Sequence, residues 1–213
     1  MDNPDLHLYA VLARTRDGCY RPRGARRSAV HLVSRGNLSA AFSVFPAAAE
    51  GPSGPEYRGV MRRLLRHSAV LPAPRRTILP SHEALLQLLS CQQNYMLEQL
   101  RRFSGLIEVR LRAVRRIKEG APPRGAATAL DDERSYLLAR FCTALCCGGF
   151  TVKPLPLRHD RELLRLGCLL PQSALPLFSS TCDALRSRHG SICELALTPP
   201  LAPVDFVDSR LFH

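Results

Sequence analysis

Residues 104–112 read Ser-Gly-Leu-Ile-Glu-Val-Arg-Leu-Arg, and within them a helical pattern gives way to an extended one. From Ile107 to Arg112 apolar and charged residues alternate strictly, which predicts a strand with one face in water. Gly105 stands just before this strand, where it can adopt the left-handed conformation that ends a helix. This helix and strand are part of the order of elements from which we predict an α+β fold class.

The helix before this strand is predicted to begin at Ser81. Ser81 is a good N-cap, and Glu83 suits the positive first turn of a helix. The apolar residues that follow recur at helical spacing: Leu85, Leu88, Leu89, Met96, Leu100 and Phe103. Their period predicts one amphipathic helix that continues to Gly105.

Shorter elements are predicted upstream of that helix. Apolar runs at residues 6–13, 29–33 and 38–45 are typical of strands, and residues 34–37 supply a turn between the last two. Residues 14–27 form a polar connection, and a short amphipathic helix follows the hairpin. The first half is therefore predicted to fold as a strand, a hairpin, two helices and a strand, with the helices on one face of a sheet.

A change of composition divides the chain. Residues 119–130 are rich in Gly, Pro and Ala, which predicts a linker. We therefore expect a basic N-terminal α+β domain over residues 1–118 and a second domain over residues 131–213 that ends in a proline-rich tail. In the second domain, helices are predicted from Asp131, from about Asp160 and over 173–189, and strands over 150–155, 167–170 and 191–197.

The formal net charge of +12 lies entirely in the first part of the chain. Residues 1–130 hold 21 Lys and Arg against 9 Asp and Glu, whereas residues 131–213 hold 9 of each kind. Such a basic half is typical of proteins with an acidic partner, such as nucleic acid, an anionic membrane or an acidic protein surface. Only Lys118 and Lys153 are lysines, so arginine codons of a GC-rich genome are a competing explanation.

The sequence lacks the motifs of common enzyme sites. It has no glycine-rich phosphate loop, no dinucleotide fingerprint and no Gly-x-Ser-x-Gly, and its seven histidines are scattered singly. The eight cysteines include no Cys-x-x-Cys, and Cys142, Cys146 and Cys147 are better explained as core residues of a helix than as metal ligands. We therefore predict no catalytic residues, no metal, no cofactor and no enzyme activity.

Composition also bears on location and on nucleic-acid binding. With 46% hydrophobic and 23% charged residues the chain should fold, its acidic start is unlike a secretory signal, and no apolar run could span a bilayer. We expect a cytoplasmic protein without membrane contact. The best nucleic-acid candidate is the arginine stripe at Arg110, Arg112, Arg115 and Arg116, although a solvated strand face and its exit is the better explanation of the stripe. A basic nucleic-acid-binding module is therefore kept as the alternative function.

Several segments, in the right order, resemble the gas vesicle protein L/F family. The matching segments are Leu8-Tyr9-Ala10-Val11 in the first strand, the hairpin from Val33 to Ala41, Val70-Leu71-Pro72 followed by Thr77, the helix and strand from Glu83 to Val109, and the tail from Pro199 to Val207. The chain differs from the family pattern at Arg75-Arg76, where Phe-Gly is usual, and in a tail without Trp or Tyr.

The resemblance implies two domains, a modified ferredoxin-like N-terminal domain and a smaller α/β C-terminal domain. It also implies a non-enzymatic accessory role in gas vesicle assembly, through binding of the hydrophobic shell protein or other gas vesicle accessory proteins, and a gas vesicle associated location. We expect contacts at the proline-interrupted segments, because their backbone N–H and C=O groups are left free to pair with a partner. We also expect contacts at the arginine stripe. The candidate protein-binding residues are Leu71, Pro72, Arg75, Arg76, Thr77, Arg110, Arg112, Pro200, Pro203 and Phe206.

Overall fold

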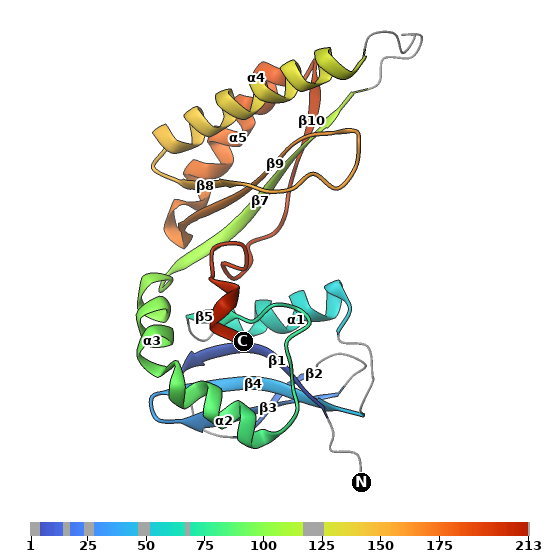
Figure 1. Cartoon of the computed structure of the whole chain (residues 1–213). Helices are drawn as coiled ribbons and strands as arrows, with labels where there is room; N and C mark the ends of the chain where they lie inside the picture. The colour runs from blue at the N-terminus through green and yellow to red at the C-terminus, as the bar shows by residue number, and fades with distance from the viewer. Residues whose placement is uncertain are drawn as a thin grey trace. The chain divides into compact units, whose positions relative to one another are not determined.

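The computed structural model describes residues 5–14, 18–23, 28–46, 52–66, 69–116 and 126–212 (Figure 1). The chain forms two compact units, each built of an antiparallel sheet and helices, so the predicted α+β class is confirmed. Unit 1 comprises Met1–Leu106 and Leu201–His213, and unit 2 comprises Ile107–Pro200.

Strand β1 lies inside the sheet of unit 1 because its residues are apolar on both faces. The sheet has the order β2-β3-β4-β1-β5, and β6 also pairs with β1. Its strands are β1 (Asp5–Ala13), β2 (Gly18–Arg23), β3 (Ala29–Arg35), β4 (Leu38–Phe45), β5 (Val70–Pro72) and β6 (Ile78–Leu79). β3 and β4 form the predicted hairpin, with Gly36 at a positive φ of 58° in its turn. β2 falls within the connection predicted at 14–27, which is therefore wrong for that part.

The helices of unit 1 cover both faces of its sheet, which corrects the prediction that they share one face (Figure 1). α1 (Gly54–Leu65) packs against β1 and β5, whereas α2 (His82–Cys91) packs against β3 and β4 on the other side. The core on the α1 face joins Tyr9 and Leu12 of β1 to Val60, Met61 and Leu64 of α1. A strand that is apolar on both faces needs a helical layer on each, which explains the arrangement.

The long predicted helix is two helices, α2 and α3 (Gln93–Arg102), with a break at Gln92. Gln92 has φ −105° and ψ 10°, outside the helical region, and no Gly or Pro marks the break in the sequence. Both predicted ends are confirmed: the Ser81 hydroxyl accepts a hydrogen bond from the Ala84 amide, and Gly105 has a positive φ of 72°.

Unit 2 places two helices against a four-stranded sheet of order β10-β7-β9-β8. Its elements are β7 (Leu106–Arg115), α4 (Ala126–Cys147), β8 (Thr151–Pro154), β9 (Glu162–Pro171), α5 (Leu175–His189) and β10 (Cys193–Leu197). Phe141 of α4 and Phe178 of α5 are fully buried, as is Leu111 of β7. The predicted helix near Asp160 is wrong, because the chain there leads straight into β9.

The compact units divide the chain elsewhere than at the predicted linker. β7 pairs with β10, with Leu111 opposite Leu197, although we expected it in the first domain. An amphipathic strand can join any sheet that covers its apolar face, and the alternation does not say which. Of the predicted linker 119–130, residues 119–125 lie outside the described ranges, and residues 126–130 are helical backbone of α4, which begins before the predicted Asp131.

The tail returns to unit 1. Ala202 is fully buried and belongs to the core cluster that holds Tyr9 and Tyr57, and Val204 packs against the same cluster. Leu211 and Phe212, near the end of the chain, are also buried. The proline-containing tail is therefore part of the hydrophobic core of unit 1.

Candidate functional site

The segment from Val70 to Pro80 follows the edge of β1 in unit 1. Val70–Pro72 pairs with Leu12–Ala10, and Ile78–Leu79 pairs with His7–Leu6. Two further backbone bonds close the gap, from the Ala73 amide to the Tyr9 carbonyl at 2.9 Å and from the Leu8 amide to the Thr77 carbonyl at 3.0 Å. The backbone that we expected to be free is thus hydrogen-bonded to β1 along this side.

Only part of this segment can meet a partner. Leu71, Pro72 and Thr77 are buried, so their side chains hold the segment in the fold. Arg75 and Arg76, in the turn between β5 and β6, are exposed, and Ile78 is 46% exposed. Of the candidate residues in this segment, the structure brings the two arginines to the surface together.

His7 of β1 is a buried, neutral histidine beside this turn. It is 2% exposed, and its ring lies edge-on to Tyr9 and Phe45 at centroid distances of 5.3 Å and 6.1 Å. Burial lowers the pKa of His7 to about 4, and a hydrogen bond to the backbone of Arg75 opposes part of that shift. Among the described residues, Nε2 of His7 has no hydrogen-bond partner.

This histidine should make the stability of unit 1 depend on pH. Between pH 6.5 and about 4 the unfolded chain binds a proton at His7 and the folded chain does not, so the free energy of unfolding should fall as the pH falls through this window. The loss should be as much as about 3 kcal/mol and should level off below the folded pKa. Urea unfolding at several pH values should show this slope, and His7→Gln should flatten it. An equal slope in the variant would assign the pH dependence to other groups.

The candidate residues of the tail are placed unevenly. Pro203 is buried, and Phe206 is half-buried and donates its amide to the Pro203 carbonyl at 3.2 Å. Pro200 is half-buried at the end of unit 2. Pro203 and Phe206 thus form one turn of the docked tail, and of these two residues Phe206 keeps some exposed surface.

Three of the four arginines of the stripe, all on β7, pair with carboxylates of unit 2, whereas the exposed Arg116 just beyond the strand pairs with none among the described residues. Nε of Arg110 lies 2.7 Å from Oε1 of Glu108, a carboxylate with no exposed surface. Nη1 of Arg112 lies 3.9 Å from Oε1 of Glu162, and Nε of Arg115 lies 3.3 Å from Oε2 of Glu133. Each of these three arginines therefore has an anionic partner within its own unit, which removes the main support for phosphate binding.

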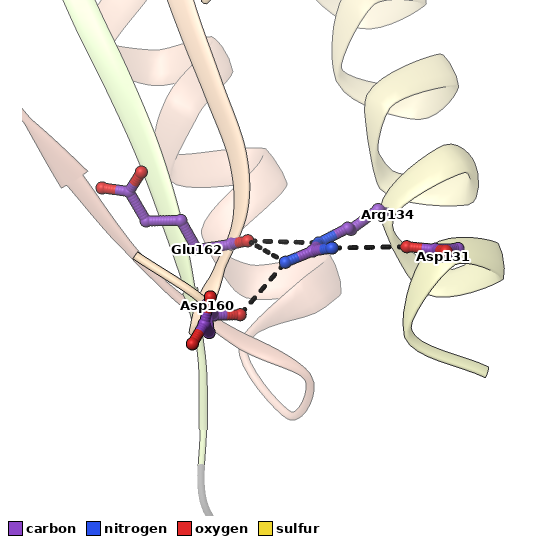
Figure 2. Close-up of polar contacts among 4 residues, drawn as sticks. All are labelled: Asp131, Arg134, Asp160 and Glu162. Carbon is purple, nitrogen blue, oxygen red and sulfur yellow. Dashed lines mark hydrogen bonds and ion pairs between the residues drawn. The ribbon is translucent and has the colours of Figure 1, made fainter. Parts of the chain in front are cut away.

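A polar cluster around Arg134 was not predicted (Figure 2). Its guanidinium donates to the carbonyl oxygens of Glu162 and Asp160, at 3.3 Å and 3.1 Å, and to Oδ1 of Asp131 at 3.3 Å. We interpreted the acidic Asp131 as a helix start, but it lies inside α4 and pairs with Arg134 three residues on. The cluster fixes α4 to the start of β9, which is a structural role.

A groove of about 620 Å³, which was not predicted, opens on the α2 face of the unit 1 sheet. It is lined by Leu6, His31, Leu32, Val33, Phe42, Val44, Ser81, His82 and Glu83. Val44 is 41% exposed, and the Phe42 ring lies between His31 and His82, at centroid distances of 5.7 Å and 6.1 Å. The run Phe42-Ser43-Val44-Phe45, which places apolar residues on both faces of β4, is the signal that points to it.

The chemistry of the groove is that of apolar contact. Its floor is formed by side chains of three strands, and the start of α2 adds a rim of Ser81, His82 and Glu83. Within the described ranges, no group of three or more His, Cys, Asp or Glu residues could hold a metal ion. No helix in the same ranges has both the length and the apolar character needed to cross a membrane. An apolar segment of another protein is the ligand that such a surface suits.

Comparison with known proteins gives a family match over part of the chain and matches of fold over nearly all of it. The family model "Gas vesicle synthesis protein GvpL/GvpF" matches residues 5–122. The crystal structure of GvpF from Anabaena sp. superposes with a TM-score of 0.78 at 13% identity, covering 96% of this chain and 98% of that one. GvpF from Microcystis aeruginosa gives a TM-score of 0.73 at 16% identity, with coverage of 95% and 98%. No curated protein matches the chain. At these identities the two structures establish a shared fold.

Proposed function

The chain belongs to the GvpL/GvpF family of gas vesicle synthesis proteins, and from this premise we propose that it assists gas vesicle assembly by binding the hydrophobic shell protein. The family match covers more than half of the chain and supports the role in assembly. The shell protein is the partner that we assign to the groove. We further propose that the protein acts without catalysis, in the cytoplasm and at the growing gas vesicle.

The observation that carries this proposal is the apolar groove of unit 1. A shell subunit with much apolar surface aggregates in water unless that surface is covered, because exposed apolar area is costly. The groove offers Val44 and Phe42 on a rigid sheet, and its polar rim at the start of α2 keeps the empty site soluble. Covering an apolar segment here would hold a subunit until it enters the vesicle wall.

The other expectations from the resemblance are kept as parts of the same proposal. Other gas vesicle accessory proteins are proposed as further partners, and the ferredoxin-like description of the N-terminal part stays a prediction. The alternative of a nucleic-acid-binding module gains no support, since Arg110, Arg112 and Arg115 are paired with carboxylates.

Val44→Glu should lower the co-purification of tagged shell protein with this chain by about tenfold or more. A carboxylate at the groove would lose its hydration when an apolar segment docks, which costs well over the 1.4 kcal/mol that a tenfold change requires. The measurement is the amount of chain retained by tagged shell protein from a co-expression lysate.

Leu177→Glu on α5 is the matched control, because Leu177 is 55% exposed and lies in unit 2. It should bind the shell protein like the unchanged protein. Equal retention of the Val44→Glu variant, or equal loss in both variants, would contradict the assignment of the groove.

A further inference from the structure

We propose that one side of α1 and the turn after β5 form a binding surface for an acidic segment of a partner protein. This arginine surface consists of Arg58, Arg62, Arg66, Arg75 and Arg76, all exposed. It goes beyond the proposed function, since it needs neither the groove nor the shell protein.

The arginines of α1 are aligned by the helix. Tyr57, Val60, Met61 and Leu64 are buried against the sheet, so the remaining side of α1 faces water. Arg58 and Arg62 of α1 and Arg66, the C-cap residue in helical conformation, follow one another at intervals of four residues along that side. Each interval is about one turn, or about 6 Å along the helix axis, so the three charges form a continuous row.

Arg75, in the turn after β5, extends this row of charges. Nη1 of Arg58 and Nη1 of Arg75 both approach Gly54, at 3.2 Å and 3.4 Å from the position that a Cβ would occupy there. The Tyr57 hydroxyl donates to the Ala73 carbonyl at 2.5 Å and so holds the turn against α1. Two guanidinium groups from separate elements are thus held at one point of the surface, where like charges repel.

The arginines of this surface have no partner among the described residues. None of the five side chains forms an ion pair or hydrogen bond there, whereas Arg110, Arg112 and Arg115 of unit 2 each face a carboxylate. Clustered cations without counter-charges repel one another and destabilise the fold unless an anion joins them. The surface is therefore complementary to a run of carboxylates, to which the guanidinium fork binds with two parallel hydrogen bonds.

The surroundings favour a protein over a nucleic acid as the source of the anions. Ile78, 46% exposed, lies two residues after Arg76 and offers the apolar contact that protein interfaces combine with arginine. Single-stranded nucleic acid binds largely by stacking on exposed aromatic rings, and the one aromatic residue of α1, Tyr57, is buried.

A titration with a short, fluorescently labelled poly-L-glutamate tests this inference. Fluorescence anisotropy at about 50 mM salt, where exposed charges are weakly screened, should show saturable binding to the full chain. The triple variant Arg58→Gln, Arg62→Gln, Arg66→Gln should bind about tenfold more weakly, as expected for three exposed ion pairs of about 0.5 kcal/mol each. Circular dichroism should show the same fold, since glutamine is a good helix former.

The matched control removes the same charge elsewhere. Arg101→Gln, Arg161→Gln, Arg188→Gln changes three exposed arginines on other elements and should weaken binding by less than about twofold. An equal loss in both triple variants would reduce the effect to net charge and overturn the proposal. If poly-L-glutamate did not bind the unchanged chain, that result would also overturn the proposal. Single-stranded DNA that binds at about 150 mM salt where poly-L-glutamate does not would overturn it in favour of a phosphate site.

Failure of this inference is distinguishable from failure of the proposed function. The groove lies on the α2 face of the sheet and α1 covers the opposite face (Figure 1). The triple variant should therefore retain shell protein as the unchanged chain does, and Val44→Glu should bind poly-L-glutamate normally.

Discussion

Ala202→Asp is expected to destabilise unit 1 by about 4 kcal/mol, which is a large share of the roughly 5–15 kcal/mol that typically separates folded from unfolded protein. Ala202 has no exposed surface and lies in the core cluster with Tyr9, Tyr57 and Val70. An aspartate there would place a carboxylate in an apolar core, and an unpaired buried charge is among the most costly substitutions. Urea unfolding followed by circular dichroism should show the loss as a lower midpoint.

Ser209→Asp is the control for this prediction, because Ser209 lies in the same tail and is exposed. It should change the free energy of unfolding by less than about 0.5 kcal/mol. If Ala202→Asp unfolds at the same urea concentration as the control, the tail is not part of the core. The prediction matters for function because Ala202 packs in the same core cluster as the buried face of α1, the helix that carries the exposed arginines.

Arg110→Met is expected to destabilise unit 2 by about 3 kcal/mol. The substitution leaves the carboxylate of Glu108, which has no exposed surface, without the guanidinium that lies 2.7 Å away. Breaking a buried ion pair from one side costs more than the pair contributes, because the remaining charge stays desolvated. The free energy of unfolding of unit 2, from urea titration of the full chain, measures the effect.

Two further variants separate a structural role of the stripe from a binding role. Glu108→Gln combined with Arg110→Met should recover part of the lost stability, because no charge then remains buried. Arg112→Met should cost less than about 0.5 kcal/mol, since Arg112 is half-exposed and 3.9 Å from its partner Glu162. If Arg110→Met lowered the free energy of unfolding as little as Arg112→Met, the Arg110–Glu108 pair would not stabilise unit 2. Arg110 would then remain a candidate contact residue.

Local signals in the sequence predicted much of the secondary structure. Ser81 caps α2, Gly105 has the left-handed conformation after α3, and the alternation from Ile107 to Arg112 is the strand β7. These features depend on residues within one or two turns of the backbone, so the chain reveals them without tertiary information.

Features that depend on distant segments were not predictable. The pattern of β7 does not say that it pairs with β10 some eighty residues later, and nothing near Ala202 says that it fills the core beside Tyr9. The alternation places Glu108 on the water-exposed face of its strand, but in the fold its carboxylate is buried against the guanidinium of Arg110. Tertiary burial, which local periodicity cannot supply, decided each of these cases.

The candidate site shows the same division. Of the candidate protein-binding residues in one segment, Arg75 and Arg76 are exposed, whereas Leu71 and Pro72 are buried in the sheet. The groove around Val44 joins three strands to the start of α2, so no single segment carries its signature. The prediction of function depended on family motifs that occur in the right order. Periodicity and composition alone predict only an α+β protein whose positive charge lies in its first part.

The most direct test of the account is whether this chain keeps purified shell protein in solution. Shell protein diluted from denaturant should stay in the supernatant after centrifugation when the chain is present in equal amount, because its apolar surface is covered by the groove. The Val44→Glu variant should leave most of it in the pellet. Equal sedimentation of shell protein with the chain, with the variant and with neither would contradict the proposed function.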